Sequence, residues 1–133
     1  MRLAEHNELV EDIFNEVRTI RLAGQKEYAH DVENCFANFE RIALLQELSR
    51  ETILMTYVLK HIDGIQSYVK GHKSQREDVR GRIVDVIVYL TLLWGMADQT
   101  DRDKRILKKS KYKDEWKSEP DRFAEEVTDE KTS

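Results

Sequence analysis

The sequence is poor in the residues that break helices or cross-link small folds. Its 133 residues contain one proline, one cysteine (Cys35) and five glycines. A single cysteine excludes an internal disulfide and the usual cysteine-based zinc sites, because both need at least two thiols. The scarcity of proline and glycine leaves few signals for turns or hairpins in the first hundred residues. The sequence therefore predicts helices rather than a sheet.

Two further absences bear on location and partners. The longest apolar run, Val86 to Trp94, is too short to cross a bilayer, and the first residues have no apolar core of the signal-peptide kind. The formal net charge is −4, so the chain has no overall positive field to attract nucleic acid. We therefore expect a cytoplasmic protein with neither a membrane nor a nucleic acid as its partner.

Apolar residues at spacings of three and four predict four helices. The first covers about residues 4–28 and the second about 34–48. A third begins after Ser49 as N-cap and ends at Gly71, and a fourth runs from a capping box at residues 74–77 to about residue 97. The fourth is apolar on nearly every face over residues 83–94, which places it at the centre of a bundle.

The composition changes beyond residue 99. A helical bundle domain is expected over residues 1–99, and a densely charged tail over residues 100–133. Within the tail we expect one more helix over residues 101–117 and disorder over the last ten residues or so. The predicted fold is therefore all-α, a bundle of four to five helices with a charged C-terminal tail.

Asp85 is the most informative candidate, because it interrupts the apolar run of residues 83–88 on the helix expected to be buried. A buried carboxylate is costly unless a cation, a metal ion or several hydrogen-bond donors lie beside it. Glu77 and Asp78 fall two turns earlier on the same helical face, and Tyr89 falls one turn later. Such an acidic face suits a Mg²⁺ ion that carries a polyphosphate.

Lys60 interrupts the third apolar stripe in the same way. It either binds a phosphate or forms an ion pair with Asp85 that ties two helices together. We interpret the adjacent His61 as a half-buried surface residue rather than a ligand or a base. Asn38 lies between two phenylalanines of the second helix, and its amide either recognises a base or caps that helix.

Four short motifs carry a resemblance to a known family. They are Lys26-x-Tyr28, Phe36-x-Asn38-Phe39-Glu40-Arg41-Ile42-Ala43, Leu59-Lys60 and Asp85-x-x-x-Tyr89-Leu90. Together, over about residues 25–97, they resemble the small phage proteins grouped as nucleotide-modification-associated domains. That group looks related to the MazG-like all-α nucleoside triphosphate pyrophosphohydrolases. The resemblance implies a MazG-like bundle in the cytoplasm of a host cell, with functional roles at Asn38, Lys60, Glu77 and Asp85.

The resulting hypothesis is a Mg²⁺-dependent enzyme that cleaves a nucleoside triphosphate between its α and β phosphates. The residues assigned to it are Glu77, Asp78 and Asp85 for the metal ion, Asp85 and Lys60 for catalysis, and Asn38, Lys60 and Tyr89 for the substrate. The Glu-Glu-x-x-Glu metal motif of MazG-like enzymes is absent. Two alternatives therefore stay open, a non-catalytic nucleotide-binding module and a factor that binds a host or phage protein.

Self-association is expected as well. The first helix carries an apolar stripe, and the fourth is apolar on more faces than a small bundle can cover. Apolar surfaces of this kind are commonly completed by further copies of the same chain. We therefore expect a homodimer or a homotetramer.

Overall fold

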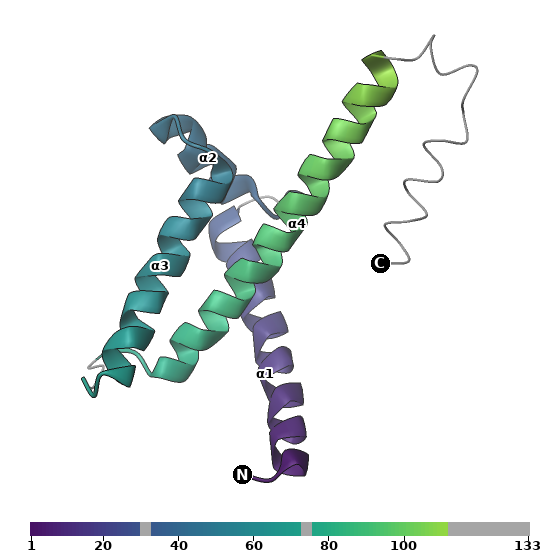
Figure 1. Cartoon of the computed structure of the whole chain (residues 1–133). Coiled ribbons are helices and arrows are strands. Elements are labelled where there is room, and N and C mark those ends of the chain that lie inside the picture. The colour runs from purple at the N-terminus through teal and green to yellow at the C-terminus, as the bar shows by residue number, and fades with distance from the viewer. Residues whose placement is uncertain (30–32, 73–75, 112–133) are drawn as a thin grey trace. The chain divides into compact units, whose positions relative to one another are not determined.

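The computed structural model describes residues 1–29, 33–72 and 76–111, and its regular elements are all helical (Figure 1). They are α1 (Leu3–Gly24), the π-helical turn η1 (Gln25–Ala29), α2 (Ala37–Gln46), α3 (Arg50–Val69) and α4 (Val79–Lys111). These described ranges contain no β-strand, which confirms the prediction of an all-α fold. No helix within them is long and apolar enough to cross a membrane.

The chain divides into two compact units, Met1–Met96 and Ala97–Ser133. The first unit holds α1, η1, α2, α3 and the N-terminal part of α4. Of the second unit, the structure describes residues 97–111, which form the C-terminal part of α4.

The ends of α3 follow the local signals in the sequence. The Ser49 side chain accepts a hydrogen bond from the backbone N–H of Thr52 at 3.1 Å, which satisfies one of the free amides of the first turn. After the last helical residues comes Gly71 with φ of 92°, a left-handed conformation that is unstrained only for glycine. The predicted N-cap and the predicted glycine stop are therefore both confirmed.

The predicted start of α4 is wrong. The helix begins at Val79, and the Asp78 carboxylate accepts a hydrogen bond from the backbone N–H of Arg80 at 2.8 Å. Asp78 thus does the capping that the sequence assigned to Ser74, a residue outside the described ranges. Glu77 precedes the helix instead of lying in its first turns.

The predicted end of α4 is wrong as well, because the helix continues without a break from about residue 97 to Lys111. This stretch contains neither glycine nor proline, and it places acidic residues four positions before basic ones, as in Asp98 and Arg102. The separate helix expected over residues 101–117 is therefore the continuation of α4 as far as Lys111. The disorder expected for the last residues concerns positions outside the described ranges.

One hydrophobic core joins all four α-helices of the first unit. Its buried members are Val17, Phe36, Phe39, Ala43, Ile53, Leu54, Val58, Val88, Leu92 and Met96. Within this unit α4 is buried on one side only, because Ile83, Leu90 and Trp94 on its other sides are 40%, 47% and 74% exposed. The expectation that α4 is covered on nearly every face is therefore wrong for a single chain.

The core predicts that alanine substitutions at two leucines change the free energy of unfolding by very different amounts. Leu54 has no exposed surface, whereas Leu44 on α2 is 82% exposed. Leu54→Ala should lower the free energy of unfolding by about 3 kcal/mol, because it removes buried methyl groups and leaves a cavity. Leu44→Ala should change it by less than about 0.5 kcal/mol. Urea denaturation followed by circular dichroism measures both, and equal effects would contradict the assigned core.

Candidate functional site

A cavity of about 500 Å³ lies between the end of α1, η1 and the facing sides of α2, α3 and α4. Four of the residues predicted from the sequence line it: Asn38, Lys60, Asp85 and Tyr89. Asn38 does not cap α2, because that helix begins at Ala37 with Phe36 at its N-cap. Residues that are far apart in the sequence therefore share one concave surface, the usual setting of a small-molecule site.

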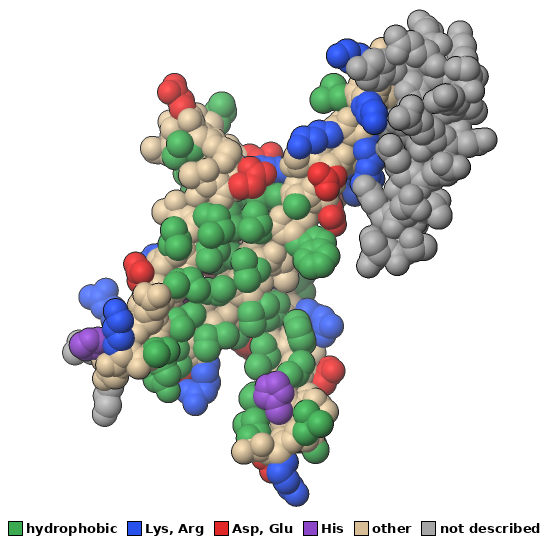
Figure 2. Space-filling view, viewed as in Figure 1, with side chains coloured by type: hydrophobic (Ala, Val, Ile, Leu, Met, Phe, Trp, Pro, Cys, Tyr) green, Lys and Arg blue, Asp and Glu red, His purple; other side chains and the backbone are tan. Residues whose placement is uncertain are grey.

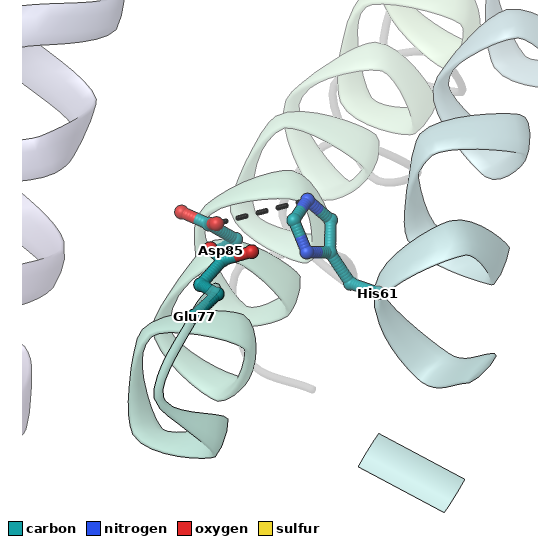
Figure 3. Close-up of side chains that lie close together, drawn as sticks. All are labelled: His61, Glu77 and Asp85. Atoms are coloured by element: carbon teal, nitrogen blue, oxygen red, sulfur yellow. Dashed lines mark ion pairs between the residues drawn. The ribbon is translucent and has the colours of Figure 1, made fainter. Parts of the chain in front are cut away.

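A cluster of three potential metal ligands, His61, Glu77 and Asp85, lies beside the cavity (Figure 3), whose lining includes His61 and Asp85 but not Glu77. Each offers one nitrogen or oxygen atom, and the three atoms lie within 4.8 Å of one another. His61 Nε2 lies 3.6 Å from Asp85 Oδ2. His61 comes from α3 and Asp85 from α4, while Glu77 comes from the segment before α4.

Helical geometry explains why His61, and not Lys60, faces Asp85. His61 continues the buried stripe of Leu54 and Val58, at spacings of four and three residues. Lys60 is turned by about 100° from His61 around the helix axis and is exposed. Among the described residues Lys60 forms no ion pair, so the predicted Asp85–Lys60 pair is replaced by Asp85 and His61. The interpretation of His61 as a half-buried surface residue is wrong, because it is only 9% exposed.

The position of Glu77 is supported by Arg82. The Arg82 Nη2 atom lies 3.7 Å from Glu77 Oε2. Gly64 of α3 leaves room for this arginine, because a Cβ atom there would lie 2.5 Å from three atoms of the Arg82 side chain. A small residue at position 64 therefore allows the guanidinium to pack against α3 and to hold the Glu77 carboxylate near Asp85.

Asp78 does not join the cluster, which corrects its predicted role as a metal ligand. Its carboxylate is exposed and is bonded to the Arg80 backbone and guanidinium. The hydrogen bond from the Arg80 backbone lowers the pKa of the Asp78 carboxyl. Asp78 is therefore used to begin α4, and its neighbour Glu77 points to the cluster instead.

The surroundings of Asp85 shift the pKa of its carboxyl in the opposite direction. Burial raises the pKa of the Asp85 carboxyl, and the nearby Glu77 carboxyl also raises it, through charge repulsion and a hydrogen bond. His61 and Arg82 act in the opposite direction without cancelling these effects. A divalent cation would relieve the same repulsion that a proton relieves in its absence.

The cavity wall next to the cluster is aromatic. The rings of Tyr57 and Tyr89 are stacked, with centroids 5.9 Å apart and planes 15° apart, and Phe39 meets both edge-on. Burial first, and then the Asp85 carboxylate, raise the pKa of Tyr89 to about 12. Tyr89 is therefore a neutral phenol at physiological pH and can donate a hydrogen bond. Aromatic rings of this kind can stack against a planar base.

Arg21 and Tyr57 line the cavity although the sequence did not single them out, and Tyr28, which was noted only within the Lys26-x-Tyr28 motif, lines it as well. Tyr28 lies in η1, where the α1 helix widens into a π-helical turn, a feature often found at functional sites. Arg21 donates a hydrogen bond to Gln25 at 2.7 Å, which fixes the end of α1 to this turn. The approach of Arg21 and Tyr28 to the cavity depends on how α1 and η1 pack, and the local pattern of the sequence carries no signal of that.

The cluster has the composition of a divalent-cation site. One imidazole and two carboxylates are three protein ligands, a number that leaves positions for water and substrate oxygens. His61 adds an independent indication, because its Nδ1 atom is buried and has no hydrogen-bond partner among the described residues. An imidazole ligand suits Mn²⁺, Fe²⁺ or Zn²⁺ better than Mg²⁺, which prefers oxygen ligands.

Comparison with known proteins adds no family to this description. No family model, no curated protein and no solved structure matches the chain.

The raised pKa of Asp85 predicts an unusual stability change. Because the folded-state pKa lies above the ordinary value of 3.8, ionised Asp85 costs stability at neutral pH. That cost is absent below the ordinary pKa and develops as the pH rises through the folded-state pKa. Asp85→Asn should therefore raise the melting temperature at pH 7 in the presence of EDTA, with little effect at pH 3.

The matched control is Asp63→Asn, an exposed carboxylate of α3 that should leave the melting temperature unchanged. Differential scanning calorimetry measures all three proteins. A lower melting temperature for Asp85→Asn at pH 7 would show that Asp85 is stabilised by a partner in the empty site.

Proposed function

We propose that this protein is a nucleotide-directed hydrolase that binds a nucleoside triphosphate through a divalent cation and cleaves it between the α and β phosphates. The observation that carries the proposal is that His61, Glu77 and Asp85 form a cluster of potential metal ligands, and two of them, His61 and Asp85, line a cavity. The same cavity is lined by basic and aromatic side chains. A polyphosphate needs a cation and basic groups, and a base needs a flat apolar wall.

The chain offers a separate group for each part of such a substrate. Arg21 and Lys60 supply positive charge for phosphate oxygens, and the stacked Tyr57 and Tyr89 supply a face for the base. The Asn38 amide can both donate and accept hydrogen bonds, as base recognition requires. A cavity of about 500 Å³ lies within the usual range for small-molecule sites.

The proposed reaction would depend on the charged side chains of the cluster and of the cavity lining. A divalent cation, when bound, supplies charge neutralisation and lowers the pKa of a water molecule beside the α phosphorus. Glu77 and Asp85 hold that cation as carboxylates, and His61 completes the ligand set. Lys60 stabilises the negative charge that develops on the departing pyrophosphate. Relative to the Mg²⁺ expected from the sequence, the imidazole makes Mn²⁺ the better candidate ion.

The resemblance to MazG-like phage proteins agrees with this proposal, because it implies the same substrate class. Through that resemblance we also propose a phage origin and the cytoplasm of a host cell as the site of action. The non-catalytic alternative would keep the cavity and the cation but release no product. The experiment described next separates the two.

The deciding measurement is pyrophosphate release from canonical and modified deoxynucleoside triphosphates, with Mn²⁺ or Mg²⁺ present. The wild-type protein should release pyrophosphate, more rapidly with Mn²⁺. Asp85→Asn should reduce release by at least about 100-fold, because an amide lacks the charge that holds the cation. Asp78→Asn is the matched control, since this exposed carboxylate lies outside the cluster, and it should retain the wild-type rate.

Two results would contradict the catalytic proposal. Nucleotide binding by calorimetry without pyrophosphate release would leave a non-catalytic nucleotide-binding module. Neither binding nor release, in a chain that circular dichroism shows to be folded, would leave the cluster as a structural feature of the α3–α4 contact.

A further inference from the structure

The helices α3 and α4 have a second surface that the described residues of the first unit leave uncovered. Figure 2 shows hydrophobic side chains gathered over α3 and α4. We call this surface the α3–α4 face, and it consists of Met55, Leu59, Ile62 and Val69 on α3 and Ile83, Val86, Leu90, Leu93 and Trp94 on α4. Five of them are between 40% and 76% exposed. Soluble monomers rarely expose a contiguous apolar surface of this kind.

The spacing on this face is that of helix–helix packing. The α4 residues 83, 86, 90 and 93 follow the seven-residue repeat in which the spacing of apolar positions alternates between three and four, and so do the α3 residues 55, 59, 62 and 69, except that Gln66 occupies the position between the last two. These stripes differ from the buried stripes of the same helices, which contain Leu54 and Val58 on α3 and Leu92 and Met96 on α4. Each helix therefore has a second apolar stripe. Its members Met55, Ile62, Val86 and Leu93 are partly buried against the core, and the other five are exposed among the described residues.

The chemistry of the face points to a partner without charge. Between Ile83 and Met96, α4 contains one charged residue, Asp85, and its side chain lines the cavity. A face of this kind has little to offer a nucleic acid or a charged peptide. It fits a second apolar face with the same helical spacing, and an identical copy supplies one.

The size of the face is that of a modest interface. Residues 55–69 of α3 extend over about 21 Å, and two helices side by side are about 20 Å wide. The face therefore has a projected area of about 400 Å², about half of the ~800 Å² that each partner buries in a standard interface.

We propose that a second copy of the chain covers the α3–α4 face. The two copies pack as a four-helix arrangement of two α3 and two α4 helices around a two-fold axis. The interface is then the same patch on both subunits, as a two-fold axis requires. The cavity opens elsewhere on the unit, between η1, α1 and α2, so the dimer keeps both sites accessible.

The test is the mass of the full-length protein by light scattering after gel filtration. At 100 µM the wild-type protein should have the mass of two chains. Leu90→Arg places a charge in the middle of the face and should give the mass of one chain with an unchanged helical circular dichroism spectrum. Leu44→Arg, at an 82% exposed leucine of α2 outside the face, is the matched control and should remain dimeric.

A wild-type mass other than two chains overturns the proposal, and so does a folded Leu90→Arg protein that stays dimeric. If Leu90→Arg fails to fold, the Trp116→Phe variant tests the dimer by fluorescence. In that variant Trp94 is the single tryptophan. Trp94 is 74% exposed in one chain. In the dimer its emission should be blue-shifted and protected from acrylamide, with a red shift on dilution. Emission typical of an exposed indole, in a protein of two-chain mass, overturns the proposal as well.

Discussion

The structure depends on one costly arrangement, two carboxyl groups and an imidazole placed together where α3 meets α4. Glu77 and Asp85 repel each other, and Asp85 is also partly removed from water, so its pKa is raised. Selection for stability alone would favour apolar side chains at such a contact. The arrangement is understandable if a cation completes it, because a divalent charge converts the repulsion into attraction. The free energy that the repulsion costs in the ion-free protein would then be recovered when the ion binds.

The rest of the first unit supports this contact from two directions. On one side α1, η1 and α2 close a cavity beside the cluster, and their residues Arg21 and Asn38 join Lys60 and the tyrosines of α3 and α4 in its lining. On the other side the α3–α4 face is apolar and uncovered. Burial of that face against a second copy would hold α3 and α4 together from outside. The proposed dimer would therefore fix the distance between His61 and Asp85, on which the proposed metal site depends.

The sequence predicted the helices well, and it predicted the site in part. Apolar spacing and local caps identified α3 from Ser49 to Gly71, because those signals are short-range. Asn38, Lys60, Asp85 and Tyr89, which the sequence singled out, all line one cavity. Two of the site predictions were wrong for one of two residues that are adjacent in the sequence. Asp78 caps α4, so Glu77 alone reaches the cluster, and the buried stripe of α3 passes through His61 instead of Lys60. The contribution of α1 depends on tertiary packing, which no local pattern encodes.

The central claim is that His61, Glu77 and Asp85 bind one divalent cation. Crystals of the full-length protein soaked in Mn²⁺ test it directly, because anomalous scattering locates manganese without reference to the protein atoms. The account predicts a single strong peak between α3 and α4, with one nitrogen of His61 and one oxygen from each carboxylate within about 2.3 Å. Strong manganese peaks elsewhere, with none at these three side chains, would contradict it.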